Sequence, residues 1–259
     1  MKTFTVRARV QGQELKLKIP EKSVFVPNLM SWFSAAQMTI VPGETFADIG
    51  TGSGLHVILA AKLGAKTAYG VDISPTVVRN ARVNARLNGV ERLCRFMSGS
   101  LVDPLVERGI KVDVMIYNAP QFPGMAVDKK LPGRLKESVD GGPGGGSLNV
   151  RFLKGAKRAL APHGRIYNPM VGWAQPELTR RAMKDFRYGV HEISRVQVPP
   201  WGRGNLTREW LLERPGKHRF DYRWPKGADT QAQMFELRVD GGKPVARELR
   251  NVVDVAFTA

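Results

Sequence analysis

The chain has 259 residues, of which 42% are hydrophobic and 24% are charged, and its formal net charge at pH 7 is +17. No stretch approaches the roughly 20 apolar residues that span a bilayer, and Met1–Lys18 lacks the apolar core of a signal peptide. We therefore expect a cytoplasmic protein with no membrane contact. Cys94 is the single cysteine, which excludes an intramolecular disulfide and a multi-cysteine metal site.

The strong positive charge favours polyanionic partners such as nucleic acid, although a purely solubilising role explains it as well. The four histidines show no metal-ligand spacing, so no metal centre is expected. His56 directly follows a glycine-rich segment, where it is expected to be structural or to border a ligand.

The first 40 residues are predicted to form an extension ahead of the main fold. Apolar residues alternate on both sides of Gln11-Gly12, which predicts a β-hairpin over Thr3–Ile19 with one buried face. Apolar side chains then recur at helical spacing between Asn28 and Met38, which predicts an amphipathic helix. We expect the main domain to occupy residues 41–259.

Beyond Val41 a pattern of strand, glycine-containing turn and helix repeats along the chain. The predicted strands are Thr45–Ile49, Ala68–Ile73, Leu93–Met97, Val112–Tyr117 and Arg165–Val171. The predicted helices are Leu55–Leu63, a helix with Ser74 as N-cap that ends at Asn88-Gly89, Leu148–Leu160 and Pro176–Phe186. This alternation predicts an α/β fold with a mostly parallel sheet and helices on both faces.

The C-terminal part differs, because Val190–Val198 and Gln231–Val239 alternate as strands and predict a closing antiparallel pair. An insertion is expected between them at about residues 199–228. Residues 180–226 carry twelve lysines and arginines against five acids, and five aromatic residues lie between Trp201 and Trp224. This combination suits single-stranded nucleic acid, and it equally suits an aromatic core under a solvated charged face.

Another group of basic residues lies on the helix that begins after Ser74. Arg79, Arg82 and Arg86 recur at helical spacing along one side of it. We expect this side to face solvent.

A glycine-rich turn joins the first strand of the main domain to its helix. Asp48-Ile-Gly-Thr-Gly-Ser-Gly54 gives GxGxG rather than the GxGxxG of dinucleotide-binding folds. Glycines allow the backbone to turn tightly and approach a ligand, while the helix N-terminus supplies free N–H donors. Asp48 suits a cationic amino group, and Asp72, at the end of the next strand, suits ribose hydroxyls. These residues favour S-adenosylmethionine (SAM) over a nicotinamide cofactor.

Several segments now resemble one family. Phe46–Gly54 and Gly70–Pro75 closely resemble the HemK/PrmC group of SAM-dependent methyltransferases. Asp113-Val-Met-Ile-Tyr-Asn-Ala-Pro-Gln121 is similar to that group's Asn-Pro-Pro-Tyr segment, and Asp140-Gly-Gly resembles the Asp-Gly-Gly stretch after it. Val26-Pro27-Asn28 resembles the group's Pro-Arg entry segment, with asparagine in place of arginine. The resemblance implies a Rossmann-like class I methyltransferase sheet, mostly parallel with a closing antiparallel strand.

The resemblance also implies which residues form the site. The implied SAM-binding residues are Asp48, Gly50, Thr51, Gly52, Gly54, Asp72, Ile73, Ser100, Leu101 and Asn118. The implied catalytic residues are Asn118 and Pro120, and the implied substrate-binding residues are Pro27, Ala119, Gln121 and Phe122. The product of the cofactor would be S-adenosylhomocysteine.

The chemistry of Asn118 supports this interpretation independently. An amide or aromatic amine nitrogen is a poor nucleophile, because its lone pair is delocalised, and it needs orientation more than acid–base catalysis. The Asn118 oxygen and a backbone carbonyl such as that of Ala119 can accept its two N–H groups, so that positioning carries much of the rate. Ala119 and Gln121 depart from the family segment, so stacking on a planar acceptor would fall to Tyr117 or Phe122.

The sequence alone leaves three functions open. The first is an N-methyltransferase acting on the amide nitrogen of a glutamine or asparagine side chain in a protein or peptide. The second is an enzyme that methylates an exocyclic amino group of an RNA or DNA base. The third is an inactive SAM-fold protein that serves as an RNA-binding module.

Overall fold

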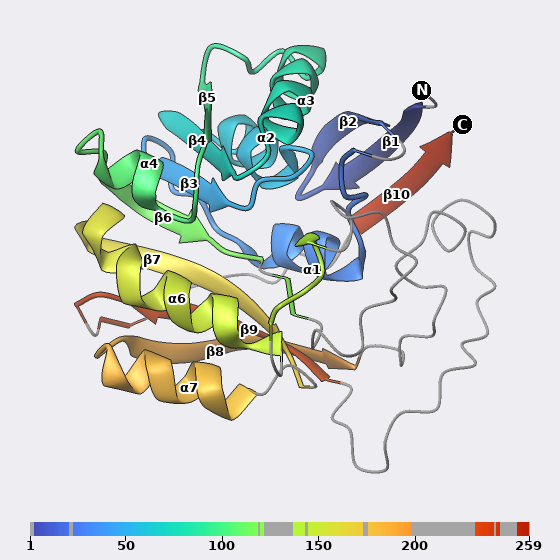
Figure 1. Cartoon of the computed structure of the whole chain (residues 1–259). Coiled ribbons are helices and arrows are strands. Elements are labelled where there is room, and N and C mark those ends of the chain that lie inside the picture. Colours follow the sequence, from blue (N-terminus) through green and yellow to red (C-terminus); the bar gives the residue numbers. More distant parts are fainter. Residues whose placement is uncertain are drawn as a thin grey trace.

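The computed structural model describes residues 3–20, 23–118, 120–121, 137–142, 145–172, 176–197, 231–240, 242–243 and 253–258. Ala119, Phe122 and the insertion expected at about residues 199–228 lie outside the described residues. The strands within these described residues form one sheet of seven and one of three (Figure 1). Among the described helices, none has the length and apolarity needed to cross a membrane.

The larger sheet carries the main domain. Its strands are β3 (Thr45–Ile49), β4 (Thr67–Asp72), β5 (Cys94–Ser98), β6 (Val112–Ile116), β7 (Leu160–Val171), β8 (Gly189–Gln197) and β9 (Gln231–Arg238). They are ordered β5-β4-β3-β6-β7-β9-β8, and β9 runs antiparallel to both of its neighbours while the first five strands of this order run parallel. The predicted sheet, mostly parallel with a closing antiparallel pair of strands, is confirmed.

Helices cover both faces of this sheet. They are α2 (Leu55–Lys62), α3 (Pro75–Leu87), α4 (Asp103–Val106), α6 (Ser147–Ala156) and α7 (Pro176–Asp185). Apolar side chains of α2 and α3 belong to one buried cluster, and those of α4, α6 and α7 belong to a second cluster. The helix predicted to reach Leu160 ends earlier, because a 3-10 turn over Lys157–Ala159 follows α6 and β7 then begins at Leu160.

The N-terminal extension contains the predicted hairpin and helix. Strands β1 (Thr3–Val10) and β2 (Gln13–Pro20) flank a turn in which Gln11 and Gly12 have φ of 50° and 76°. These two positive φ values are those of a tight type I′ hairpin. Helix α1 (Leu29–Gln37) follows. Strand β10 (Val253–Thr258) pairs antiparallel with β1 and completes the smaller sheet, which the sequence pattern did not predict.

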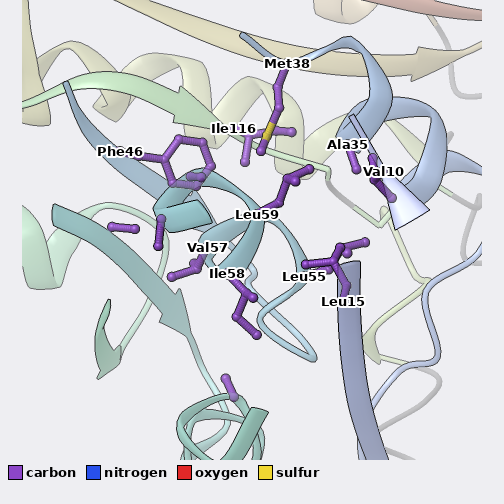
Figure 2. Close-up of a cluster of buried hydrophobic side chains, with 14 of the residues drawn as sticks. Val10, Leu15, Ala35, Met38, Phe46, Leu55, Val57, Ile58, Leu59 and Ile116 are labelled. Atoms are coloured by element: carbon purple, nitrogen blue, oxygen red, sulfur yellow. The ribbon is translucent and has the colours of Figure 1, made fainter. Parts of the chain in front are cut away.

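The extension and the main domain share one apolar core. Figure 2 shows Val10 and Leu15 of the hairpin and Met38, which follows α1, packed around Leu55 and Leu59 of α2. All five side chains are at most 3% exposed. Burying a side chain of this size contributes about 1.5–3 kcal/mol, so the extension is anchored firmly against α2.

An asparagine of α3 and the one that caps its C-terminus close the free edge of β2. The Asn84 side chain accepts the N–H of Lys18 (2.8 Å) and donates to its carbonyl (3.1 Å), and Asn88 does the same with Lys16 (3.0 and 2.7 Å). Asn84 also donates to the carbonyl of Ser53 at 2.9 Å. Amide side chains one helical turn apart therefore replace a neighbouring strand and tie the hairpin to the glycine-rich turn.

Candidate active site

A cavity of about 610 Å³ lies at the carboxyl ends of the parallel strands. Segments that follow β3, β4, β5 and β6 all contribute to its wall, together with residues of α1 and the chain before it. The predicted site residues that line it are Pro27, Gly50, Thr51, Gly52, Asp72, Ile73, Ser100, Leu101, Asn118, Pro120 and Gln121. The fold thus gathers eleven of these residues where ligands bind in open α/β sheets.

The glycine-rich turn presents bare backbone to this cavity. Gly50, Gly52 and Gly54 have φ of 76°, 54° and 85°, which residues with a side chain rarely adopt. A Cβ on Gly50 would meet nothing within 4 Å, and one on Gly52 would meet only the Gly50 carbonyl oxygen. A Cβ on Gly54 would lie 3.2 Å from that of Ala81. Gly50 and Gly52 therefore leave room for a ligand, whereas Gly54 lets α2 approach α3.

Asp72 lies at the end of β4, on the wall of the cavity. Its two carboxylate oxygens accept the N–H groups of Gly52 (3.1 Å) and Ser74 (3.0 Å). Burial raises the pKa of this carboxyl above its usual value, and the two N–H groups oppose that shift. Each oxygen keeps a lone pair for another donor, so the carboxylate can accept a pair of vicinal hydroxyls.

An apolar side chain beside Asp72 stays open to solvent. Ile73 lines the cavity and is 72% exposed, which is unusual for a large aliphatic residue. On the neighbouring strand end, Leu101 has φ of 47° and also lines the cavity, next to Ser100. These residues suit the flat, partly apolar face of an adenine.

Asp48 lies behind the cavity wall rather than on it. Its side chain is 1% exposed, and its carboxylate is 3.4 Å from Nδ1 of His56, which does line the cavity. On the other side of the ring, Nε2 of His56 is 2.9 Å from the Ser34 hydroxyl and 3.2 Å from the Ser31 carbonyl. Any contact of Asp48 with a ligand's amino group would thus pass through His56.

Asn118 follows β6 and faces the extension. Its Nδ2 donates to the Ser31 hydroxyl at 3.4 Å, across 87 residues of sequence. Ser31 is the third residue of α1, and Asn28 is the N-cap of that helix. The two form a capping box, in which each side chain bonds the other residue's backbone N–H. In the part of the chain that the structure describes, no group donates to the Asn118 oxygen.

Two other residues near Asn118 in the sequence, Gln121 and Tyr117, are held by contacts with neighbouring elements. Gln121 is 6% exposed. Its side-chain amide donates to the Pro169 carbonyl and accepts the N–H of Val171, each at 3.0 Å, so it binds this segment to β7. The Tyr117 ring packs on Phe152 with centroids 4.2 Å apart. Tyr117 is therefore held in the core at the cavity wall.

The sequence interpretation did not assign Ser31 or Asn28 to the site. The signal that could have indicated them is the Asn-x-x-Ser spacing of a capping box directly after the Val-Pro entry segment. That signal predicts a helix start, but it does not predict a contact with Asn118.

Comparison with known proteins assigns the family. Residues 31–119 match the model described as ribosomal protein L11 methyltransferase (PrmA). Over 190 residues the chain is 30% identical to a Methanocaldococcus jannaschii protein provisionally named protein N5-glutamine methyltransferase, covering 73% of this chain and 92% of that protein. The chain belongs to the HemK/PrmC-like family of SAM-dependent methyltransferases. The expected family resemblance is confirmed.

Other matches to this methyltransferase are partial or distant. It is 36% identical over 162 residues to the release factor glutamine methyltransferase of Moorella thermoacetica, which covers 60% of this chain but only 54% of that enzyme. A solved ribosomal protein L11 methylase from Lactobacillus delbrueckii superposes with a TM-score of 0.54 at 16% identity, covering 83% and 81% of the two chains. Trm5 from M. jannaschii, solved with adenosine, superposes with a TM-score of 0.55 at 14% identity, covering 92% of this chain and 56% of that chain. These two structures confirm the class I fold.

The cavity fits the cofactor of the family, which is SAM. The open backbone at Gly50 and Gly52 leaves room for the methionine part of the cofactor. The paired acceptors of Asp72 suit its ribose, and the exposed Ile73 suits its adenine. The methyltransferase would thus hold the cofactor over β3, β4 and β5, with Asn118 at the far side, just after β6.

Proposed function

We propose that this methyltransferase transfers a methyl group to the side-chain amide nitrogen of a glutamine in a protein. The observation that carries the proposal is Asn118, whose amide nitrogen is bonded to α1 while its oxygen is free to accept within the described residues. An acceptor N–H can bond that oxygen directly beside the cofactor residues. Two relatives, matched over 190 and 162 residues, are named for glutamine methylation.

The orientation of the Asn118 amide follows from a backbone group whose polarity is certain. The N–H of Ser31 can only donate, so the Asn28 atom that it bonds at 3.1 Å is the oxygen. The same oxygen takes the hydroxyl proton of Ser31 at 3.3 Å. With that proton on Asn28, the Ser31 oxygen offers lone pairs to Asn118, which favours an NH₂ group turned toward α1 and an oxygen turned away.

This orientation serves an amide acceptor. SAM supplies a methyl group that the sulfonium charge makes electrophilic. The acceptor nitrogen must direct its weak lone pair at that methyl, and an N–H bonded to the Asn118 oxygen fixes the plane of the amide. We expect the carbonyl of Ala119 to accept the second N–H, although Ala119 lies outside the described residues.

The acceptor side of the cavity is mainly apolar. Tyr117, Val139, Leu148 and Val171 contribute to its wall, and Pro120 adds a rigid contact next to Asn118. Such a wall excludes water and accommodates the aliphatic stem of a glutamine. Exclusion of water also strengthens the hydrogen bond to the Asn118 oxygen.

A labelling experiment tests the proposal. The purified enzyme is incubated with methyl-labelled SAM and cell extract, and the products are treated with protease or nuclease. We expect the label to follow a protease-sensitive product, and acid hydrolysis to release it as methylamine from a methylated amide. Label that resists protease and is released by nuclease would instead assign the enzyme to a nucleobase, and the glutamine proposal would be wrong.

A further inference from the structure

A second concave surface lies on the opposite side of the cofactor residues from Asn118, at the free edge of the seven-stranded sheet. Strand β5 forms this edge, and α3 lies beside it (Figure 1). The groove has a volume of about 510 Å³ and runs between α3, β5 and the turn after α4. Four arginines line it: Arg82 and Arg86 on α3, Arg95 on β5 and Arg108. Glu91 is the one acid among the described residues on its wall.

Two arginines of the groove are held in place by neutral groups. Arg82 donates to the Phe96 carbonyl at 2.7 Å, and Arg95 donates to the carbonyls of Arg92 and Cys94 at 2.8 and 3.0 Å. These are neutral acceptors, which orient a guanidinium and leave its charge and remaining N–H groups available.

Acids near the groove compensate little of this charge. Among the residues that the structure describes, the one carboxylate within 4 Å of a groove arginine is that of Glu107, 3.8 Å from Arg108. Both of these side chains are more than half exposed, so solvent screens their attraction. All four arginine side chains are exposed. The groove therefore presents four positive charges against one negative charge on its wall.

Among the described residues, the lining of the active-site cavity does not share this excess. Its lining contains the acids Asp72 and Glu137 and the cation Arg151. Neither the cofactor nor a neutral amide requires a net charge of +17, so we infer that a separate partner accounts for part of it. Arg79, exposed on the same side of α3, extends the positive surface beyond the groove.

We propose that this arginine groove binds the phosphate backbone of RNA. Guanidinium groups are planar forks that match phosphate oxygens with two hydrogen bonds, and all four cations of the groove are arginines rather than lysines. A chain with this net charge also attracts a polymer of regularly spaced negative charges over a long range. The proposal goes beyond methyl transfer and does not depend on which nitrogen accepts the methyl group.

The groove lies apart from the acceptor. Three strand-to-strand steps separate β5 from β6, which is about 14 Å at the usual spacing. RNA bound in the groove would leave the residues around Asn118 free. The groove thus fits an enzyme that holds RNA and its methyl acceptor at the same time.

Fluorescence anisotropy with a labelled RNA of about 20 nucleotides tests the proposal. The groove variant is Arg82→Gln/Arg86→Gln/Arg95→Gln. The matched control is Arg7→Gln/Arg9→Gln/Arg181→Gln, which removes three exposed cations from β1 and α7. Both are measured between 50 and 200 mM salt, after thermal unfolding and SAM titration establish that each variant folds.

We expect the groove variant to bind RNA at least about tenfold more weakly, and its plot of log K against log salt to be shallower by about 2 for three lost phosphate contacts. The control should lose less than about threefold. Equal losses in both variants would mean that net charge alone acts and would overturn the groove assignment. Absence of RNA binding by the wild type at 50 mM salt would overturn it too. Displacement of RNA by polyglutamate at equal charge concentration would also overturn it, because it would identify an acidic protein as the partner.

Discussion

The cofactor side and the acceptor side of the active-site cavity are assembled in different ways. The cofactor side comes from three consecutive strand ends within residues 49–101, and its contacts, such as Asp72 to Gly52 and Ser74, join neighbouring strand ends or adjacent residues. On the acceptor side, one hydrogen bond joins Asn118 to Ser31, which are 87 residues apart in sequence. Two more join Gln121 to β7 residues that are about 50 positions away. The cofactor side is built from segments close in sequence, whereas the acceptor side depends on how the N-terminal extension packs against the main domain.

This difference separates the expected effects of substitutions. Changes on the cofactor side should alter the Kd for SAM, because we expect those residues to contact the cofactor whether or not an acceptor is bound. Changes on the acceptor side should alter kcat, since they disturb the orientation of the acceptor nitrogen at the moment of transfer. A single substitution that changed both the Kd for SAM and kcat by large factors would contradict this division of the cavity.

The largest effect is expected for Asn118→Ala. The acceptor amide would lose the oxygen that orients it, and a misplaced nucleophile costs about 100-fold in rate. We expect kcat to fall by about that factor, while the Kd for SAM, measured by calorimetry, rises far less. Asn118→Asp keeps an acceptor oxygen at the same position and should retain more activity than the alanine variant. A large loss of SAM affinity with unchanged kcat would move Asn118 to the cofactor side.

Asp72→Ala should have the next largest effect. Hydrogen bonds to a charged group contribute about 1.5–3 kcal/mol, which corresponds to a Kd for SAM raised by about 10- to 100-fold. The variant also leaves the N–H groups of Gly52 and Ser74 without their acceptor. At saturating SAM, kcat should stay within a small factor of the wild-type value. Unchanged calorimetric affinity would mean that this carboxylate only shapes the turn.

The same contrast between local and distant contacts explains what the sequence could predict. Glycines at 50, 52 and 54 and the acid at 72 act through backbone conformation and a strand end, both of which are local properties of the chain. The cavity gathers most of these residues as expected. Gly54 and Asp48 do not line it. Gly54 lies against α3, and the place of Asp48 behind His56 depends on the packing of α1 against α2.

Contacts between distant segments were beyond the sequence pattern. Alternating residues predict a strand but not its partner, so the pairing of β10 with β1 was not foreseen. The capping box of Asn28 and Ser31 predicts a helix start, yet its bond to Asn118 requires the extension to fold over β6. Gln121 was assigned to the substrate from its position in the family segment, and the structure shows its amide bonded to the β7 backbone.

Ser31→Ala tests whether the extension acts on catalysis. Without the hydroxyl, the Asn118 amide loses the partner that fixes its orientation, so we expect kcat to fall by about tenfold, a value typical of one modest hydrogen bond at about 1.4 kcal/mol. The KM for the acceptor should change less than kcat. Ser31→Thr retains the hydroxyl and should restore most of the rate.

A purely structural role for Ser31 makes a different prediction. Loss of the capping box would lower the unfolding temperature, and both variants would be compared at a temperature well below it. Asn118 side-chain NH₂ resonances, assigned with Asn118→Asp, should shift in Ser31→Ala even without acceptor. If they do not move while kcat falls, Ser31 does not position Asn118.

The smallest effect is expected for Ile73→Ala, at the edge of the cofactor side. Ile73 is 72% exposed, so its side chain gains apolar burial only when a ligand covers it. Removing most of an aliphatic side chain that is partly covered should cost about 1 kcal/mol, which raises the Kd for SAM about fivefold. The unfolding temperature should stay unchanged, because the free protein buries little of this residue, and Ile73→Leu should bind SAM nearly as the wild type does. Calorimetry and thermal unfolding separate the two quantities. A drop in kcat with unchanged affinity would contradict the division, since it would make a residue of the cofactor side act on the acceptor.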